Sequence, residues 1–261
     1  MTKPKLLCFG HSHLVCIDVA VKWREQSLEG FRDAFDIRFE QLRREPYHPN
    51  FVDVGGKREL TTECENAMAS AIADFKPDAI LAVFSGQEYQ IFSILNHPIK
   101  FDFVTPNNPA YVPKNSEIIP FVLVKAQLKY LIERSVLIFI DKIKGITNVP
   151  VFMVAPPPPI ESEEHILTYP GPFAEDAKEF GVSPAPFRRK VWKVYCDILK
   201  EEGARHGANV LMPPKTVMDN GYMAQDCWRK DPVHGNVKYG NAIIHMVLNR
   251  AFGHAGVNKH D

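Results

Sequence analysis

The sequence predicts an α/β protein, a flavodoxin-like three-layer α/β/α sandwich around a mostly parallel five-stranded sheet. Two observations indicate this fold. Five short apolar runs occur along the chain, and longer segments with helical periodicity lie between them. Strands that alternate with helices are typical of a parallel sheet covered on both faces. The 261 residues are enough for one large domain, so we expect a single domain over residues 1–261.

The five apolar runs have the length and composition of strands that are buried on both faces. They occupy residues 5–9, 36–42, 79–84, 149–155 and 208–212. The helical segments occupy residues 14–28, 61–75, 117–144, 186–206 and 239–252. The second helical segment opens with Thr61 and Thr62 as candidate N-caps, and Glu65 follows in its first turn.

Two proline-containing stretches interrupt the alternation, near residues 96–120 and 160–186. Long irregular segments in a compact domain often form lids or binding loops. Two interpretations of these insertions stay open. They cover the rim of a binding site, or they pack on the surface and make an oligomer contact.

The composition is ordinary for a soluble globular protein, with 45% apolar and 24% charged residues. The 31 basic and 31 acidic residues cancel, which removes any general electrostatic case for binding nucleic acid or an anionic membrane. The five cysteines include no Cys-x-x-Cys pair, which argues against a disulfide framework or a zinc knuckle. No apolar stretch matches a membrane span or a signal-peptide core. We therefore expect a cytoplasmic protein with no nucleic-acid or membrane partner, and the oligomeric state stays open.

Two short motifs carry the groups that acyl transfer needs. The first apolar run leads into Gly10-His11-Ser12-His13, and Asp231-Pro-Val-His234 precedes the last helical segment. Ser12 is the candidate nucleophile, His234 the general base and Asp231 the carboxylate that fixes the imidazole tautomer. Ser12 also suits the N-cap of the following helix, and the two roles are compatible. At such a junction its own backbone N–H can stabilise an oxyanion.

This arrangement resembles the SGNH (GDSL-type) hydrolase family, which carries an early Gly-Asp-Ser, a middle Gly, a Gly-x-Asn-Asp and a late Asp-x-x-His. The late block, from Asp231 to Asn236 with the following Tyr239-Gly240, is the closest match. The resemblance implies the predicted fold, ester chemistry without a cofactor, and the triad Ser12, His234 and Asp231.

The oxyanion hole that the resemblance implies draws on the Ser12 backbone N–H and on two further positions. Gly55 or Gly56 supplies the middle glycine, although the pair also suits a plain turn with positive φ. Glu88 stands where the family has its asparagine, and an ionised carboxylate cannot donate a hydrogen bond. Three interpretations stay open: Gln87 supplies the amide, Glu88 is protonated or turned away, or the hole is broken.

A further departure is His11, which replaces the family's aspartate before the serine. His11, His13 and Trp228 are candidate substrate contacts. The histidines also raise a metal alternative, since imidazole and carboxylate ligands suit zinc. An extended segment would however place His11 and His13 on the face opposite Ser12, so no metal is expected.

Three functions are compatible with these residues. The first is a serine esterase that forms an acyl-enzyme on Ser12 and removes an acyl group from a carbohydrate or another small alcohol, with a carbohydrate O-deacetylase as one such enzyme. The second is an O-acyltransferase that passes the acyl group to a saccharide. The third is a catalytically impaired protein that binds a glycan or a partner. For either enzyme the expected substrate is a small-molecule or saccharide ester.

Overall fold

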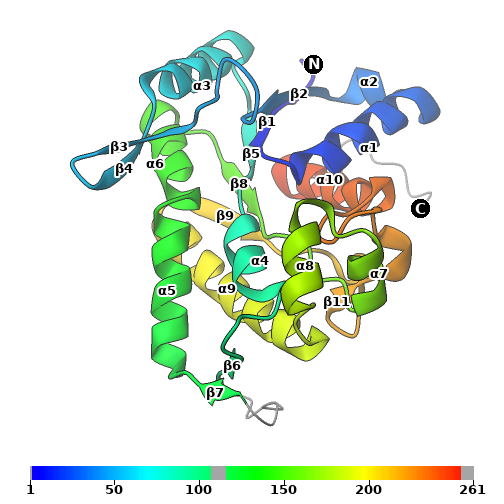
Figure 1. Cartoon of the computed structure of the whole chain (residues 1–261). Helices are drawn as coiled ribbons and strands as arrows, with labels where there is room; N and C mark the ends of the chain where they lie inside the picture. The colour runs from blue at the N-terminus through cyan, green and yellow to red at the C-terminus, as the bar shows by residue number, and fades with distance from the viewer. Residues whose placement is uncertain (1, 107–115, 254–261) are drawn as a thin grey trace.

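The central sheet of the computed structural model, which describes residues 2–106 and 116–253, has five parallel strands. They are β1 (Lys5–Gly10), β2 (Asp36–Gln41), β5 (Ala79–Val83), β8 (Val151–Val154) and β9 (Ala208–Leu211). Their order across the sheet is β2-β1-β5-β8-β9, the flavodoxin-like order of a doubly wound fold (Figure 1). The predicted fold class is confirmed, and each strand lies within two residues of its predicted limits.

Helices cover both faces of this sheet because its strands are apolar on both sides. Along β1, Leu6 and Cys8 belong to one apolar cluster, and Leu7 and Phe9 to the other. The first cluster is closed by α1 (Leu14–Ser27) and α10 (Val237–Phe252). The second is closed by α3 (Thr62–Phe75), α5 (Phe121–Glu133), α6 (Val136–Ile146) and α9 (Ala185–Arg205). Thr61 caps α3 as predicted, since its side chain accepts from the Cys64 N–H.

The long helix predicted over residues 117–144 is two helices in the structure. Pro120 precedes α5. The helical conformation is interrupted at Arg134 and Ser135, and α6 begins at the next residue. The Ser135 hydroxyl oxygen lies 2.7 Å from the Leu131 carbonyl oxygen, and such local side-chain contacts with the backbone compete with helix continuation. The apolar pattern runs through both helices, and this is why the sequence alone did not show the break.

The two insertions carry short elements of their own. In the first, β6 (Phe101–Asp102) pairs with β7 (Glu117–Ile118), and residues 107–115 lie outside the described part of the chain. A buried ion pair between Lys190 of α9 and Asp102 fixes this segment. The second insertion contains α7 (Glu163–Thr168) and α8 (Ala174–Phe180), and α8 is drawn between α4 and α7 in Figure 1.

The remaining elements are short connections around the sheet. The helices are α2 (Phe31–Ala34) and α4 (Gln87–Ser93), with 3-10 turns at Gly171–Phe173, Lys215–Val217 and Gln225–Cys227. The strands β3 (Phe51–Val54) and β4 (Lys57–Leu60) form a hairpin, as do β10 (Met218–Asp219) and β11 (Tyr222–Met223). Sequence periodicity did not reveal these elements because they are too short to show it.

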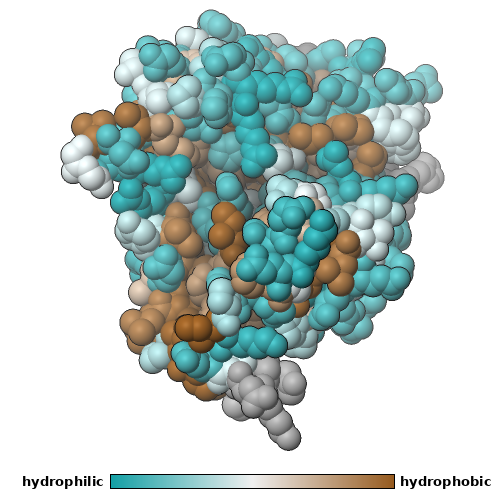
Figure 2. Space-filling view, in the orientation of Figure 1, coloured by the Kyte–Doolittle hydropathy of each residue, from teal (hydrophilic) through white to brown (hydrophobic). Residues whose placement is uncertain are grey.

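An apolar surface runs over α5 and β7 (Figure 2). Ile118, Val122 and Leu123 are each more than half exposed there. Among the described residues, no helix has the length and apolarity to cross a membrane.

The contact between α1 and α10 generates a stability prediction. A Cβ built on Gly240 would lie 2.1 Å from the Cys16 carbonyl oxygen, so the helix backbones touch there. We expect Gly240→Ala to lower the free energy of unfolding by about 3 kcal/mol, because two backbones must separate. Gly145→Ala in α6 is the matched control, since a Cβ there meets nothing within 4 Å. Urea unfolding of both variants measures the difference, and equal stabilities would contradict the close packing.

Candidate active site

Ser12 lies at the carboxyl edge of the sheet, between the end of β1 and the start of α1. Gly10 allows this tight transition, because a Cβ there would lie 2.7 Å from the Val83 carbonyl oxygen. Ser12 is half-buried, and within the described residues its backbone N–H donates to no other group. The N-cap of α1 is His13, so Ser12 lies in the turn just before the helix rather than at its N-cap, and its free N–H is a donor suited to an oxyanion.

Asp231 and His234 form the second part of the site, in the loop that leads into α10. Asp231 Oδ2 lies 3.1 Å from His234 Nδ1, and its Oδ1 accepts the backbone N–H groups of Val233 and His234. Burial alone would raise the pKa of Asp231, but the hydrogen bond and charge of His234 outweigh it and hold the pKa below its usual value. The ionised carboxylate keeps the ring proton on Nδ1, so His234 Nε2 is left as a base.

The Nε2 atom of His234 is buried and has no hydrogen-bond partner in the described part of the chain. No hydrogen bond joins it to the Ser12 hydroxyl among those residues. The ring of His13, the residue after Ser12, packs on the His234 ring with centroids 4.6 Å apart. The structure therefore brings His13, His234 and Asp231 together, and Ser12 precedes His13 in the chain.

The ring of His13 contacts Gly86, which precedes α4, and Gln90, which lies on α4. The Nε2 atom of His13 lies 3.2 Å from the side-chain nitrogen of Gln90, and a Cβ on Gly86 would lie 2.7 Å from the same atom. The amide nitrogen can only donate, so His13 Nε2 accepts and the ring proton sits on Nδ1. Burial, followed by the charge of His234, lowers the pKa of His13, which keeps this ring neutral beside the base.

Gln90 is a site residue that sequence reasoning missed. It lies on α4, whose seven residues are too few to show a clear period, and no family block marks it. Position 86 requires glycine, because its φ is 134° and the side chain of any larger residue would displace His13.

Glu88 has a structural role. It lies on α4 but contacts α9 and the residue before α6, not His13. Its carboxylate accepts from Tyr195 Oη at 2.8 Å, from Ser135 Oγ at 2.5 Å and from the Gly86 N–H at 3.2 Å. Burial and then the charge of Glu88 raise the pKa of Tyr195, so this phenol stays protonated as a donor. The placement of Glu88 in the oxyanion hole is therefore corrected, since both oxygens of its carboxyl group are already held by these three groups.

The placement of Gly55 and Gly56 in the oxyanion hole is also corrected. Both are exposed at the tip of the β3–β4 hairpin, with φ of 58° and 80°, and nothing lies within 4 Å of a Cβ built on either. The alternative of a plain positive-φ turn is the one that the structure shows. Gln87, by contrast, is exposed as the first residue of α4, and its role as amide donor stays a prediction.

The remaining predicted contacts have mainly packing roles in the structure. The His11 ring lies against Phe84 and Phe139, and its pKa is lowered to about 4 by burial and then by the charge of Arg43. Trp228 donates its indole N–H to the Met223 carbonyl at 2.8 Å, which helps to fix the loop of His234. Their contact with substrate stays a prediction. Among the described residues, no group of three or more His, Cys, Asp and Glu is arranged to hold a metal ion.

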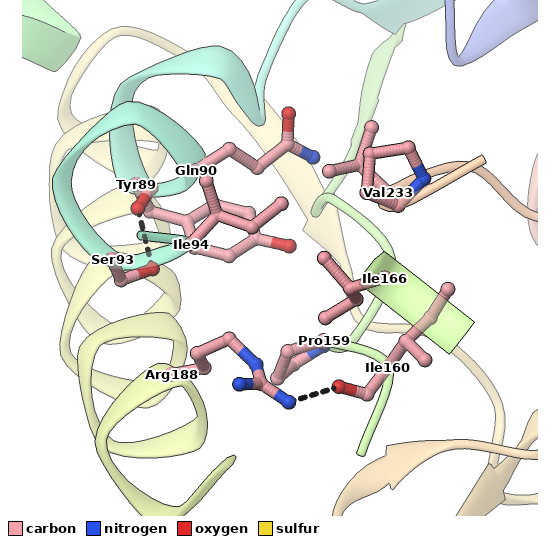
Figure 3. A pocket seen from close by; sticks show the side chains of 10 residues that line it. Tyr89, Gln90, Ser93, Ile94, Pro159, Ile160, Ile166, Arg188 and Val233 are labelled. Atoms are coloured by element: carbon pink, nitrogen blue, oxygen red, sulfur yellow. Dashed lines mark hydrogen bonds between the residues drawn. The ribbon is translucent and has the colours of Figure 1, made fainter. Parts of the chain in front are cut away.

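A small, largely apolar pocket adjoins the site between α4, α7 and the His234 loop (Figure 3). Gln90 and Val233 face each other across one end of it, which places it next to His13 and His234. Arg188 closes the other end and donates to the carbonyls of Ile160, Glu161 and Ser183. The other lining residues are Tyr89, Ser93, Ile94, Pro159, Ile160, Ile166 and Pro232.

No protein-family model and no curated protein matches the chain. Solved structures do match it. The lipopolysaccharide acetyltransferase periplasmic domain of Salmonella ser. Paratyphi A is 12% identical, with a TM-score of 0.53 over 95% of this chain and 84% of that one. A putative acylhydrolase from Bacteroides fragilis is 9% identical, with a TM-score of 0.47 over 96% and 89% of the two chains. A carbohydrate acetylesterase from Sinorhizobium meliloti is 13% identical, with a TM-score of 0.43 over 95% and 98%.

Of these three structures only the first has a TM-score above 0.5, and at 12% identity the similarity concerns the fold alone. The roles of individual residues rest on the geometry of this chain. The chain, with its five-stranded parallel sheet, therefore shares an α/β/α fold with that acetyltransferase domain.

Proposed function

We propose that the chain is a serine ester hydrolase of the SGNH type that acts through Ser12, His234 and Asp231. The observation that carries this proposal is the hydrogen bond by which Asp231 orients the imidazole ring of His234. Asp231 lies 3.1 Å from Nδ1 of His234, while Nε2 is buried and unpartnered among the described residues. A base prepared in this way, at the same sheet edge as a serine with a free backbone N–H, suits acyl transfer.

The reaction follows from these positions. Ser12 Oγ attacks the ester carbonyl carbon while His234 Nε2 takes the hydroxyl proton. The oxyanion accepts from the Ser12 N–H and, in this proposal, from the Gln87 side-chain amide. Collapse breaks the bond to the alcohol, which leaves with the proton from His234. Water then attacks the acyl-enzyme with His234 again as base, and the acid is released.

The neutral ring of His13 is important in this scheme. His234 becomes a cation when it takes the serine proton, and a charged neighbour packed on its face would oppose that step. Because burial keeps His13 neutral, the ring supports the base without repelling the imidazolium.

For the substrate we propose a small acyl group, such as acetyl, on a carbohydrate hydroxyl. The pocket that adjoins Val233 is small and leaves no room for a long acyl chain (Figure 3). Transfer of the acyl group to a saccharide instead of water uses the same residues. Since an acetyltransferase domain has a similar fold, product analysis with and without a saccharide acceptor should accompany each hydrolysis assay.

We expect Ser12→Ala to lower kcat for an acetate ester by at least about 1,000-fold, because the nucleophile is lost. The variant should unfold at the same temperature as the native chain. Ser27→Ala, at the exposed end of α1, is the matched control and should keep full activity. Hydrolysis at the native rate by Ser12→Ala would contradict the assignment of the nucleophile.

Replacing Asp231 tests the support of the base. Asp231→Asn should lower kcat by about two to four orders of magnitude, because the amide no longer fixes the proton on Nδ1 of His234. Asp226→Asn is the control, since Asp226 is an exposed partner of Lys238 in the same region. Steady-state kinetics on both variants separates a loss in kcat from a change in KM. Equal activities of the two variants would show that Asp231 does not support the base.

Glu88→Gln distinguishes a structural carboxylate from one in the oxyanion hole. The structure predicts a free energy of unfolding lower by about 1–3 kcal/mol, because one of the donors around Glu88 then faces an amide NH₂. The kcat of the folded variant should stay close to that of the native chain. A large rise in kcat, with unchanged stability, would place Glu88 beside the oxyanion after all.

A further inference from the structure

The loop that follows β2 lies beside the catalytic serine. Gln41 pairs with Gly10 in the sheet, and the Leu42 N–H donates to the Gly10 carbonyl at 2.9 Å. Arg43 follows Leu42 directly after β2, and Ser12 lies two residues beyond Gly10, the last residue of β1. Because paired strands are about 4.8 Å apart and successive Cα atoms about 3.8 Å apart, the Cα atoms of Arg43 and Ser12 lie within about 16 Å, which an arginine side chain and a small substrate together can span.

The backbone under Arg43 is fixed although its side chain is exposed. Leu42 is fully buried, and Tyr47 is buried with its ring packed edge-on against Phe9. The Asn50 amide closes the loop by donating to the carbonyls of Leu42 at 2.7 Å and Tyr47 at 2.9 Å. A pinned loop presents its cation from a defined place at the rim of the site.

Arg43 has no counter-ion among the described residues. By contrast, Arg134 pairs with Asp53, and Arg229 lies 3.5 Å from Asp231. After burial, the charge of Arg43 is among the causes that lower the pKa of both His11 and His13. Its field therefore reaches the residues on both sides of Ser12, while the hydrolytic mechanism gives this cation no role.

We propose that Arg43 is a specificity-determining residue that favours esters whose alcohol part carries an anionic group, such as the carboxylate of an acidic saccharide. The proposal rests on the proposed ester hydrolysis and adds the charge class of the substrate. In this proposal the ester carbonyl carbon lies next to Ser12 Oγ. The alcohol part points toward the rim of the site, where Arg43 attracts its anionic group. The protein as a whole is neutral, so this preference is local to the rim.

Three acetate esters of one phenol frame test this inference: phenyl acetate, 3-carboxyphenyl acetate and 3-(trimethylammonio)phenyl acetate. In the native chain and in Arg43→Gln, kcat/KM is measured for each, and ratios to phenyl acetate are compared between the two proteins. Intrinsic reactivity cancels in this comparison. We expect Arg43→Gln to lower the anionic-to-neutral ratio by about three- to tenfold at low ionic strength, and 1 M salt to remove most of the difference.

Two further variants sharpen the test. Arg43→Glu should reverse the preference in favour of the cationic ester. Arg44→Gln removes an exposed arginine from the same loop and should leave all ratios unchanged. An unchanged ratio in Arg43→Gln, or an equal change in Arg44→Gln, would overturn the assignment of Arg43.

A binding measurement separates this inference from the proposed function. The dissociation constants of the anionic and neutral esters are measured by NMR titration on Ser12→Ala, with and without Arg43→Gln. If the native chain hydrolyses no ester but Arg43→Gln still weakens binding of the anion alone, hydrolysis is refuted and the role of Arg43 stands. If hydrolysis occurs and Arg43→Gln changes neither ratios nor binding, the hydrolase stands and the role of Arg43 is refuted.

Discussion

The hydrogen bond between Asp231 and Nδ1 of His234 is the interaction on which the candidate site depends. It holds the ring proton on the side away from the reaction and leaves Nε2 as a base. Burial opposes ionisation of Asp231, but the hydrogen bond and charge of His234 hold its pKa below the usual value, and two backbone N–H groups of the same loop hold the carboxylate in place. The loop is anchored in turn by Asn236, whose side chain caps α10. One short segment thus contains the base, its support and the start of the helix that positions both.

The sheet brings this segment to the serine. Strand β1 ends at Gly10, where only a hydrogen side chain fits against β5, and the next residues turn at once into α1. Helices α1 and α10 pack in backbone contact at Gly240, so the residues before their first turns share one edge of the sheet. His13 fills the space between them and packs on the base. The position of the site is therefore a consequence of how two helices cover one face.

Most of the sheet was predictable, because buried parallel strands are apolar on both faces and bounded by turns. The three triad residues and Ser12's helix junction also follow from their motifs, although their catalytic roles stay predictions, as does a cytoplasmic location. What the sequence did not reveal depends on short elements and on contacts between distant residues. Gln90 reaches His13 only because α4 forms. Glu88 is held by Tyr195 and Ser135, far along the chain, and the turn role of Gly55 depends on strand pairing.

The central claim is that Ser12 is an activated nucleophile beside a supported base. Intact-mass measurement after treatment with a fluorophosphonate tests it most directly, on the native chain and on Ser12→Ala. The account predicts one adduct on the native chain, formed at the serine, and none on the variant. No adduct on a folded native chain, or the same adduct on both proteins, would contradict the claim.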